Sequence, residues 1–432
     1  MGNGTRSRRS LVRSLAALAV LVGLLTPPGG QASAGHAGGE YFDLGALPGT
    51  DFNGKQIFDG LKQFVADYPV RITGTPNEIR AGQHLHAEME ALGYDSKTCS
   101  VPTNANVVCD EGPGVGLKAI VATKRGTTRP DEWIMFIGHY DTVAAPPFGN
   151  PTTVDGAYDN GAGTNFIRYV AKEFADVQTN RSMVFVFYNG EEEGLLASQR
   201  HAQYLKNSGQ KITAVLGFDM IGIAFPVASP KAKNCMCMFH GADDAAVGQP
   251  LLDHVNYEFL GFPGRGLPTS RDARLVGANT RNSDESSFNT QGFFTLRWAG
   301  MRTAADYIGY HKQNDTIETI VAEAGGETYY EQGVENTLKS VYYTALALDN
   351  HLPVPEGTVT ADGLRVTADG SASTDEDAAP GAISWTFGDG ASSMGSVVNH
   401  TYANPGTYEV TMTVADNLWS QVTRSRTFSI TV

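Results

Sequence analysis

Residues 183–196 are MVFVFYNGEEEGLL. The first six residues form an unbroken apolar run of strand length, which is typical of a strand covered on both faces. Three glutamates follow the end of this run, and Gly194-Leu195-Leu196 begins a helical pattern. A strand that leads through a polar turn into a helix is the repeating unit of an α/β fold. Ligands bind such folds at the carboxyl ends of the strands, so the glutamates are candidate site residues.

The same alternation of strands and helices extends over about residues 40–351. Further apolar runs of strand length are Lys118–Thr123, Trp133–Ile137 and Ile212–Phe218. Helical periods lie at Asn77–Leu92, which Gly93 closes, at Asn160–Phe174 and at Tyr329–Leu348. We therefore predict a three-layer α/β/α domain with a central mixed, largely parallel sheet.

A different pattern begins after a Pro-rich linker at residues 352–357. In the tail, residues 358–432, Tyr408, Val410, Met412 and Val414 alternate with polar residues, as in a half-buried antiparallel strand. Further strand candidates are Val366–Ala368, Ile383–Phe387 and Phe428–Val432. Short strands and turns without a helical period predict a small all-β sandwich.

The first 34 residues have the pattern of a secretory signal peptide. Four arginines and no acidic residue precede an apolar run that ends near Leu25, and Ala32-Ser33-Ala34 then supplies a cleavage site after Ala34. The run is too short to span a membrane. The segment Ser7-Arg8-Arg9 also resembles a twin-arginine export signal, although an ordinary signal peptide explains the arginines equally well. We expect a secreted, extracellular protein.

Charge and hydropathy argue against two classes of partner, nucleic acid and the membrane interior. The chain has 32 basic and 46 acidic residues, and removal of the four arginines of the leader lowers the basic count to 28. So acidic a protein is unsuited to nucleic acid. Beyond the leader, no stretch is long and apolar enough to span a membrane.

Four cysteines fit an oxidising destination. Cys99 and Cys109 can pair across a loop-like stretch, whereas a bridge between Cys235 and Cys237 would be strained. Three pairings exist, and the sequence alone does not choose among them.

Five short stretches carry residues that suit zinc. Their candidate ligands are His139, Asp159, Glu191-Glu192, Asp219 and His311. Taken singly, each has a commoner explanation, such as a helix cap, a turn or a surface charge. Together, two imidazoles and three carboxylates are the donor set of a two-metal site, and several follow strands that end at one edge of the sheet. Such a site predicts hydrolysis by a metal-bound hydroxide.

The local sequences GHYDT, GAYDNGAG, GEEEGL, FDMIG and YHKQNDT, at residues 138–142, 156–163, 190–195, 218–222 and 310–316, occur in that order. This set resembles the secreted di-zinc aminopeptidases of the aminopeptidase Y and bacterial leucyl aminopeptidase type. The resemblance covers about residues 41–351. It implies that His139 and Asp219 bind one zinc, that Glu192 and His311 bind the other, and that Asp159 bridges the two.

The resemblance also implies the catalytic roles. Glu191 would be the general base, Asp141 would orient His139, and Tyr310 would help to stabilise the tetrahedral intermediate. A cis peptide bond would follow the bridging aspartate. Charge counting agrees, because three ligand carboxylates and one hydroxide neutralise two Zn²⁺ ions and leave Glu191 free to accept a proton.

The expected substrates are peptides or proteins with a free N-terminus, since carboxylates beside the metals suit an α-ammonium group. A glutaminyl cyclase-like acyltransferase or a carboxypeptidase on the same scaffold is an alternative. A non-catalytic binding scaffold is disfavoured, because all five ligands are present. The chain departs from the family at Ser283-Asp284-Glu285-Ser286-Ser287-Phe288, where relatives often have Ser-Asp-His, so its side-chain preference is expected to differ.

The tail contains WTFGDG at residues 385–390, followed by HTY at 400–402 and GTY at 406–408. It closely resembles the PKD domain, which implies a binding or spacing module for protein or polysaccharide surfaces. Asp375, Glu376 and Asp377 could bind calcium, but a solvated turn is the favoured interpretation. On helices of the first domain, His84, His86 and His201 are expected to be solvated.

Overall fold

A computed structural model describes residues 52–102, 107–109, 116–143, 154–223, 225–226, 233–240, 273–278, 283–300, 307–418 and 423–432. The predicted signal peptide lies outside these ranges. No helix within them combines the length and apolar character that a membrane span needs.

Strands and helices alternate up to Asp349, as predicted. The helices are α1 (Gly54–Asp67), α2 (Pro76–Ala91), α3 (Gly163–Phe174), α4 (Leu196–Ser208), α6 (Glu285–Thr290), α7 (Ile317–Ala324) and α8 (Glu327–Asp349). The strands are β1 (Asp95–Ser100), β2 (Val108–Cys109), β3 (Lys118–Lys124), β4 (Arg129–His139), β5 (Arg181–Tyr188), β6 (Lys211–Phe218), β7 (Phe225–Pro226), β8 (Lys233–His240), β9 (Ala273–Ala278) and β10 (Thr295–Ala299). Strands β3 to β6 and helices α2, α3 and α8 cover the predicted runs.

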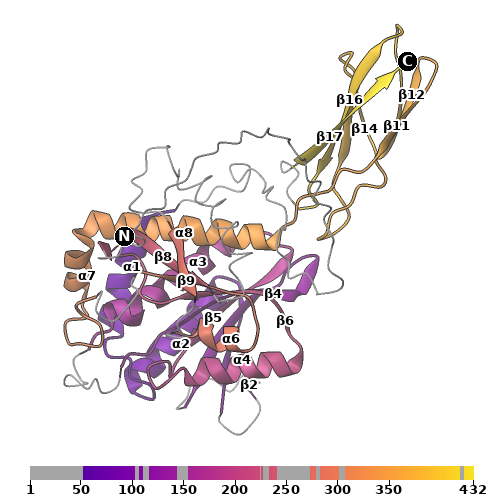
Figure 1. Ribbon diagram of the computed structural model, residues 1–432. Helices are drawn as coiled ribbons and strands as arrows, with labels where there is room; N and C mark the ends of the chain where they lie inside the picture. Colours follow the sequence, from indigo (N-terminus) through magenta and orange to yellow (C-terminus); the bar gives the residue numbers. More distant parts are fainter. Residues whose placement is uncertain are drawn as a thin grey trace, which may run out of the picture. The chain divides into compact units, whose positions relative to one another are not determined.

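One mixed sheet joins all these strands in the order β2-β1-β3-β5-β4-β6-β10-β8-β7, with β9 paired to β8 (Figure 1). Its centre is parallel: β4 pairs with β5 and β6, and β10 pairs with β6. Strands β1, β2 and β3 at one side, and β8 at the other, join it in antiparallel fashion. The central strands therefore end at the same edge of the sheet.

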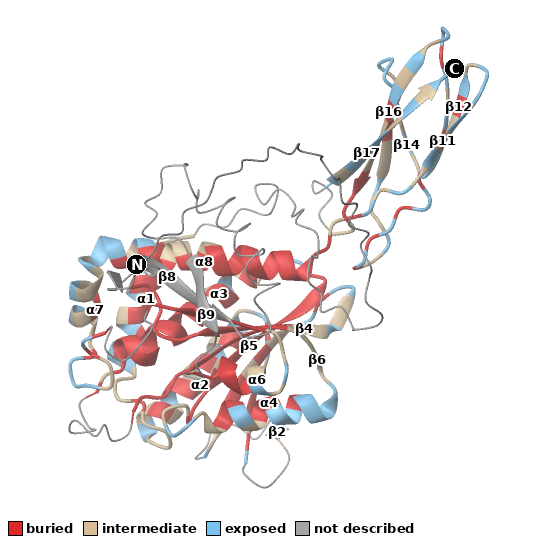
Figure 2. Ribbon diagram, in the orientation of Figure 1, coloured by how far each residue is buried: buried red, intermediate tan, exposed pale blue. Residues whose placement is uncertain are grey.

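Helices cover both faces of the sheet, which confirms the three-layer prediction (Figure 1). Side chains from α1, α2, α3 and α8 pack with one set of strand residues, including Phe136, Phe185 and Leu216. Side chains from α4 and α6 pack with the alternate set, including Met135 and Val186. Period-two alternation sends successive residues of a strand to opposite faces, so a strand between two helical layers is apolar throughout. Figure 2 shows β5 buried along its whole length.

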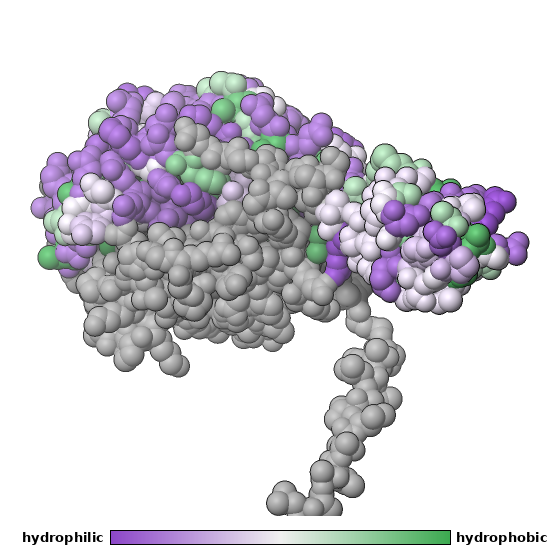
Figure 3. Space-filling view, turned by 90° about the horizontal axis from the view of Figure 1, so that it is seen from above, coloured by the Kyte–Doolittle hydropathy of each residue, from purple (hydrophilic) through white to green (hydrophobic). Residues whose placement is uncertain are grey.

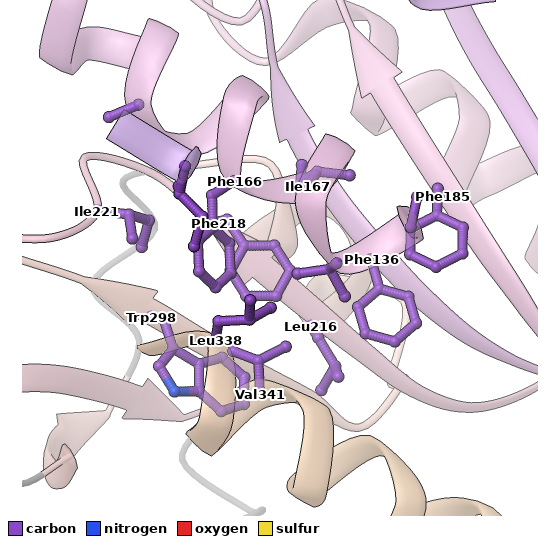
Figure 4. Close-up of a cluster of buried hydrophobic side chains, with 14 of the residues drawn as sticks. Phe136, Phe166, Ile167, Phe185, Leu216, Phe218, Ile221, Trp298, Leu338 and Val341 are labelled. Carbon is purple, nitrogen blue, oxygen red and sulfur yellow. The ribbon is translucent and has the colours of Figure 1, made fainter. Parts of the chain in front are cut away.

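A stack of aromatic rings supports the end of the central strands (Figure 4). Phe136 of β4, Phe218 of β6 and Trp298 of β10 are fully buried neighbours. The ring centroids of Phe136 and Phe218 lie 6.4 Å apart, and those of Phe218 and Trp298 lie 5.7 Å apart. Each buried aromatic side chain stabilises the fold by roughly 1.5–3 kcal/mol, so this core fixes the strand end that precedes Asp219.

Cys99 of β1 and Cys109 of β2 form a disulfide bond and are directly opposite each other in the register of the two strands. This is one of the pairings that the sequence left open. Cys235 and Cys237 belong to β8, and their side chains lie outside the described part of the structure.

The tail forms two antiparallel sheets, as predicted. One has the order β11-β12-β15, and the other β14-β13-β16-β17. Their bounds are β11 (Thr358–Asp362), β12 (Arg365–Asp369), β13 (Ile383–Thr386), β14 (Ser392–Met394), β15 (Val397–Thr401), β16 (Thr407–Ala415) and β17 (Thr423–Thr431). Trp385, Val410 and Met412 form the core between the sheets, and the hydroxyl of buried Tyr402 donates to the carbonyl of Phe387.

The expectation of a solvated turn at residues 375–377 is wrong for two of its three acids. Asp375 and Asp377 are buried, and only Glu376 is exposed. Asp377 accepts hydrogen bonds from the backbone N–H of His351 and lies 2.9 Å from its Nδ1. A carboxylate can be buried when it has hydrogen-bond partners, and the local sequence does not show that Asp377 has such partners.

Candidate active site

Three of the five predicted stretches follow neighbouring parallel strands. β4 ends at His139, β5 ends three residues before Glu191, and β6 ends one residue before Asp219. His139 lies opposite Tyr188 in the register of β4 and β5, and Ile137 lies opposite Gly217 in that of β4 and β6. The carboxyl ends of these strands thus bring the three stretches together.

His139 is the centre of a first group of candidate ligands. Its Nε2 atom lies 3.5 Å from Asp159 Oδ1, 3.7 Å from Asp219 Oδ1 and 3.9 Å from Glu191 Oε2. Its other nitrogen, Nδ1, lies 3.4 Å from Asp141 Oδ1. The imidazole therefore has one nitrogen toward the carboxylates and the other toward Asp141, which is the arrangement of a histidine whose ring is oriented by a carboxylate.

His311 is the centre of a second group. Its Nε2 atom lies 3.0 Å from Glu192 Oε2 and 3.3 Å from Asp159 Oδ2. Asp159 thus directs one oxygen toward His139 and the other toward His311, as a bridging ligand would. Glu191 and Glu192 separate although they are adjacent, because Glu191 lies with His139 and Asp219 while Glu192 lies with Asp159 and His311.

The chemistry of these donors fits two metal ions. Both ring nitrogens of His139, Glu192 Oε1 and Asp219 Oδ1 are buried, and none of them has a hydrogen-bond partner among the described residues. A buried polar atom without a partner costs roughly 1–3 kcal/mol, so such atoms are explained best by a cation that they share. Imidazole nitrogens and carboxylate oxygens are the donors that zinc takes in catalytic sites.

Asp141 joins the two groups through the backbone. Its carboxylate accepts hydrogen bonds from the backbone N–H of Glu191 at 3.4 Å and of Glu192 at 3.3 Å. The hydroxyl of Thr73 donates to it at 3.2 Å. Asp141 is fully buried, so the residue predicted to orient His139 also holds the turn that carries both glutamates.

Asn160 holds three ligand-bearing segments together. Its side-chain amide donates to the backbone carbonyls of His139 at 3.2 Å and Phe218 at 3.0 Å. Its side-chain oxygen accepts from the backbone N–H of Gly163 at 2.9 Å and of Met220 at 3.1 Å. The predicted cis peptide bond between Asp159 and Asn160 is present. Asn160 thus bonds the first N–H of α3, while the adjacent Asp159 faces the two histidines.

Asp315 is a residue of the site that the sequence reasoning missed. Its buried carboxylate accepts from the backbone N–H of Tyr158 at 2.8 Å, from that of Asp159 at 3.0 Å and from the hydroxyl of Tyr307 at 2.8 Å. It therefore ties the loop of His311 to the segment of Asp159. The only local signal was an acid four residues after a candidate histidine ligand, and its partners are remote in sequence.

Two ligand segments have a left-handed backbone. Met220, next to Asp219, has φ 55°, and His311 has φ 52°. Non-glycine residues in this region cost of order 1–3 kcal/mol and persist only where the surroundings enforce them. Here Asn160 holds the N–H of Met220, and the ring of Tyr310 stacks on that of His311 with centroids 3.9 Å apart.

Burial and crowding of charge shift the titration of the group. Burial raises the pKa of Glu192 to about 7, and the charge of Asp159 adds to this effect. Burial, reinforced by Glu192, also raises the pKa of Glu191 well above its usual value. Burial opposes the charged form of His311, but hydrogen bonds to Asp159 and Glu192 outweigh it and raise its pKa to about 10. Burial and nearby carboxylates raise the pKa of Tyr310, which keeps its O–H as a donor.

Two regions of the chain match known protein families. Residues 119–329 match peptidase family M28, and residues 350–432 match the PKD domain. A "Probable zinc metalloprotease" of Pyrenophora tritici-repentis is 34% identical over 141 residues, which are 33% of this chain and 31% of that protein. A "probable leucine aminopeptidase 2" of Aspergillus oryzae is 24% identical over 322 residues, covering 60% of this chain and 61% of that protein. The chain thus spans less than a third of the length of the first relative.

Solved structures share the fold. LapB from Legionella pneumophila has a TM-score of 0.52 at 16% identity, over 69% of this chain and 73% of that chain. A glutaminyl cyclase from an Acidobacteriales bacterium has a TM-score of 0.50 at 19% identity, over 70% of this chain and 97% of that one. At these identities the likeness establishes the fold alone. Together with the motifs, the two matched families show that this chain carries a peptidase family M28 domain followed by a PKD domain.

Proposed function

We propose that this chain is a secreted aminopeptidase that uses two zinc ions to hydrolyse the N-terminal peptide bond of peptides or proteins. The observation that carries the proposal is the placement of Asp159, which directs one carboxylate oxygen toward each of the two histidines. The matches to peptidase family M28 and to a leucine aminopeptidase support it.

The ligands divide as the sequence motifs imply. His139 and Asp219 would hold one ion, Glu192 and His311 would hold the other, and Asp159 would bridge them. When bound, the two ions supply Lewis acid chemistry that polarises the scissile carbonyl and makes water a stronger nucleophile at neutral pH.

Glu191 is the proposed general base. Its carboxylate lies beside His139 and Asp219, and Asp141 holds its backbone N–H. Its raised pKa suits a group that takes the proton of the attacking water and then delivers it to the leaving amine. The O–H of Tyr310, stacked on His311, is the proposed donor to the oxygen of the tetrahedral intermediate.

The proposed preference for a free N-terminus follows from charge. Asp159, Asp219, Glu191 and Glu192 lie within one small region, and a positive α-ammonium group is favoured there. An acetyl group removes that charge. We expect an N-acetylated peptide to be cleaved at least about a hundredfold more slowly than the free peptide, on the scale of a lost buried charge interaction. Equal rates would point to an endopeptidase or another acyl hydrolase.

The runner-up function is a glutaminyl cyclase-like acyl transfer, for which the shared fold is the observation. Relatives of that type work with one metal, whereas this chain offers two groups of donors. A peptide that begins with glutamine separates the two proposals. Hydrolysis should release free glutamine, whereas a cyclase would retain the residue as pyroglutamate and lower the mass of the peptide by ammonia.

We also propose export through the N-terminal leader, with cleavage after Ala34. The four arginines and the apolar run support this proposal. Protein collected from the medium should begin at Gly35. A secreted form that retains Met1 would contradict it. The PKD domain is proposed to bind or space protein or polysaccharide surfaces, and cosedimentation with insoluble polysaccharide would test this role.

A further inference from the structure

The stretch that departs from the family pattern lies against a candidate metal ligand. Glu285 begins α6 and is fully buried. It packs on Gly217 of β6, where an added Cβ atom would come within 2.9 Å of the Cβ atom of Glu285. Gly217 therefore leaves the space that this glutamate occupies, two residues before Asp219.

A buried arginine contacts both acids. Arg297 of β10 lies opposite Gly217 in the parallel register of β10 and β6. Its Nη2 atom lies 3.0 Å from Asp219 Oδ2, and its Nη1 atom lies 3.8 Å from Glu285 Oε1. Only 8% of the side chain of Arg297 is exposed, so these charges interact with little screening by water.

The two carboxylate oxygens of Asp219 have different surroundings. Oδ2 accepts the hydrogen bond of Arg297, whereas Oδ1 faces His139 and has no hydrogen-bond partner among the described residues. Asp219 is thus held in one orientation and presents a single oxygen to the first metal position. The guanidinium that holds it also repels a cation bound there, and the negative charge of Glu285 offsets that repulsion.

We propose that Arg297 and Glu285 act as a charge pair that sets the metal affinity of the His139–Asp219 position. Both are positioning residues, since they act through a metal ligand and not on the substrate. The inference rests on the proposed two-metal site.

The test is a zinc titration of the full metal-free protein in competition with a chromophoric chelator, at fixed pH and ionic strength. The wild type should show two binding steps. His311→Ala should remove the binding step of the Glu192–His311 position. The step that remains in this variant is therefore that of the His139–Asp219 position. Glu285→Gln, which removes the charge but keeps the shape, should weaken that step about tenfold or more and leave the other within about threefold.

Three further variants complete the design. Glu285→Asp keeps the charge and should stay within about threefold of the wild type, as should the double variant Arg297→Gln/Glu285→Gln, which removes both charges. Glu90→Gln, on the exposed side of α2, is the matched control. If Glu285→Gln changes neither step, or both equally, the inference fails while the proposed function stands. A wild type that binds fewer than two ions overturns both.

Discussion

Asn160 and Asp315 show how single buried side chains arrange the site before a metal is bound. Neither is predicted to touch a metal, yet each holds backbone groups of ligand-bearing segments. Preorganised ligands need little rearrangement on binding, which is the usual reason for a rigid supporting shell. At this scale the site depends on hydrogen bonds to the backbone as much as on its ligands.

Asn160→Ala is expected to lower the free energy of unfolding by about 3 kcal/mol or more, because it removes four hydrogen bonds to buried backbone groups. Urea unfolding of the metal-free protein, followed by a probe of the M28 domain, measures the change. Asn207→Ala, at an exposed position of α4, is the control and should change stability by less than about 0.5 kcal/mol. Equal losses in the two variants would contradict the role given to Asn160.

At the scale of elements, the sequence predicted β3 to β6, but it missed β10 in the parallel centre of the sheet and β1 at one side. The inner parts of β3 to β6 are apolar because helices cover both of their faces. β1 is DSKTCS, with only two of its six residues buried, so it carries no apolar signal. Its position depends on pairing with β3, which residues close in sequence cannot specify.

The histidine of α4 differs most clearly from its predicted environment. His201 was expected to be solvated, but it is only 3% exposed, and its Nδ1 atom lies 2.7 Å from the hydroxyl of Tyr188 on β5. The buried side of α4 carries small or polar residues such as Ala197, Ser198 and Ala202. The helical spacing of large apolar residues is therefore weak, and the sequence does not show which side of α4 is buried. The partner that makes a buried histidine acceptable comes from another element.

The buried His201 is expected to make the stability of the fold decrease at acidic pH. Burial lowers the pKa of His201 to about 4. Below about pH 6.5 the unfolded chain binds a proton that the folded chain does not, so stability falls as the pH decreases toward 4, by at most about 1.4 kcal/mol per pH unit. Above about pH 6.5 this histidine contributes no pH dependence.

The double variant His201→Leu/Tyr188→Phe should lose that component. The free energy of unfolding of the variant minus that of the wild type should be about 3 kcal/mol larger at pH 4 than at pH 7. Denaturant unfolding at several pH values measures the difference. Tyr188→Phe alone keeps the histidine and should keep the wild-type slope. If the double variant and the wild type show parallel pH profiles, His201 is not held neutral by burial.

At the scale of the whole molecule, the acidic residues of the surface and those of the site have different environments. The chain carries a formal net charge of −14, and the part of its surface coloured in Figure 3 is mainly hydrophilic. In the site, by contrast, the carboxylates are buried or half-buried and close to one another. Clustered buried acids repel unless cations neutralise them, which is why the fold and the proposed metals belong together.

The sequence could predict that these residues lie close together because His139, Glu191 and Asp219 stand at or just after the ends of strands that finish at one edge of the sheet. It did not find Arg297 or Asp315, and it noted Glu285 only as part of a departure from the family pattern, since each acts on a residue remote in the sequence. The assignment of Glu191 and Glu192 to different roles came from the family resemblance. The structure places them in different donor groups, and their roles stay a prediction.

The most direct test of the central claim compares Glu191→Gln with Glu193→Gln in metal content and turnover on one preparation. Both variants should retain two zinc ions per chain. Glu191→Gln should lose about a thousandfold or more in kcat, as expected when a general base is removed, whereas Glu193→Gln, an exposed neighbour on the same turn, should stay near the wild type. A Glu191→Gln variant that binds both ions and turns over peptides at the wild-type rate would contradict the account.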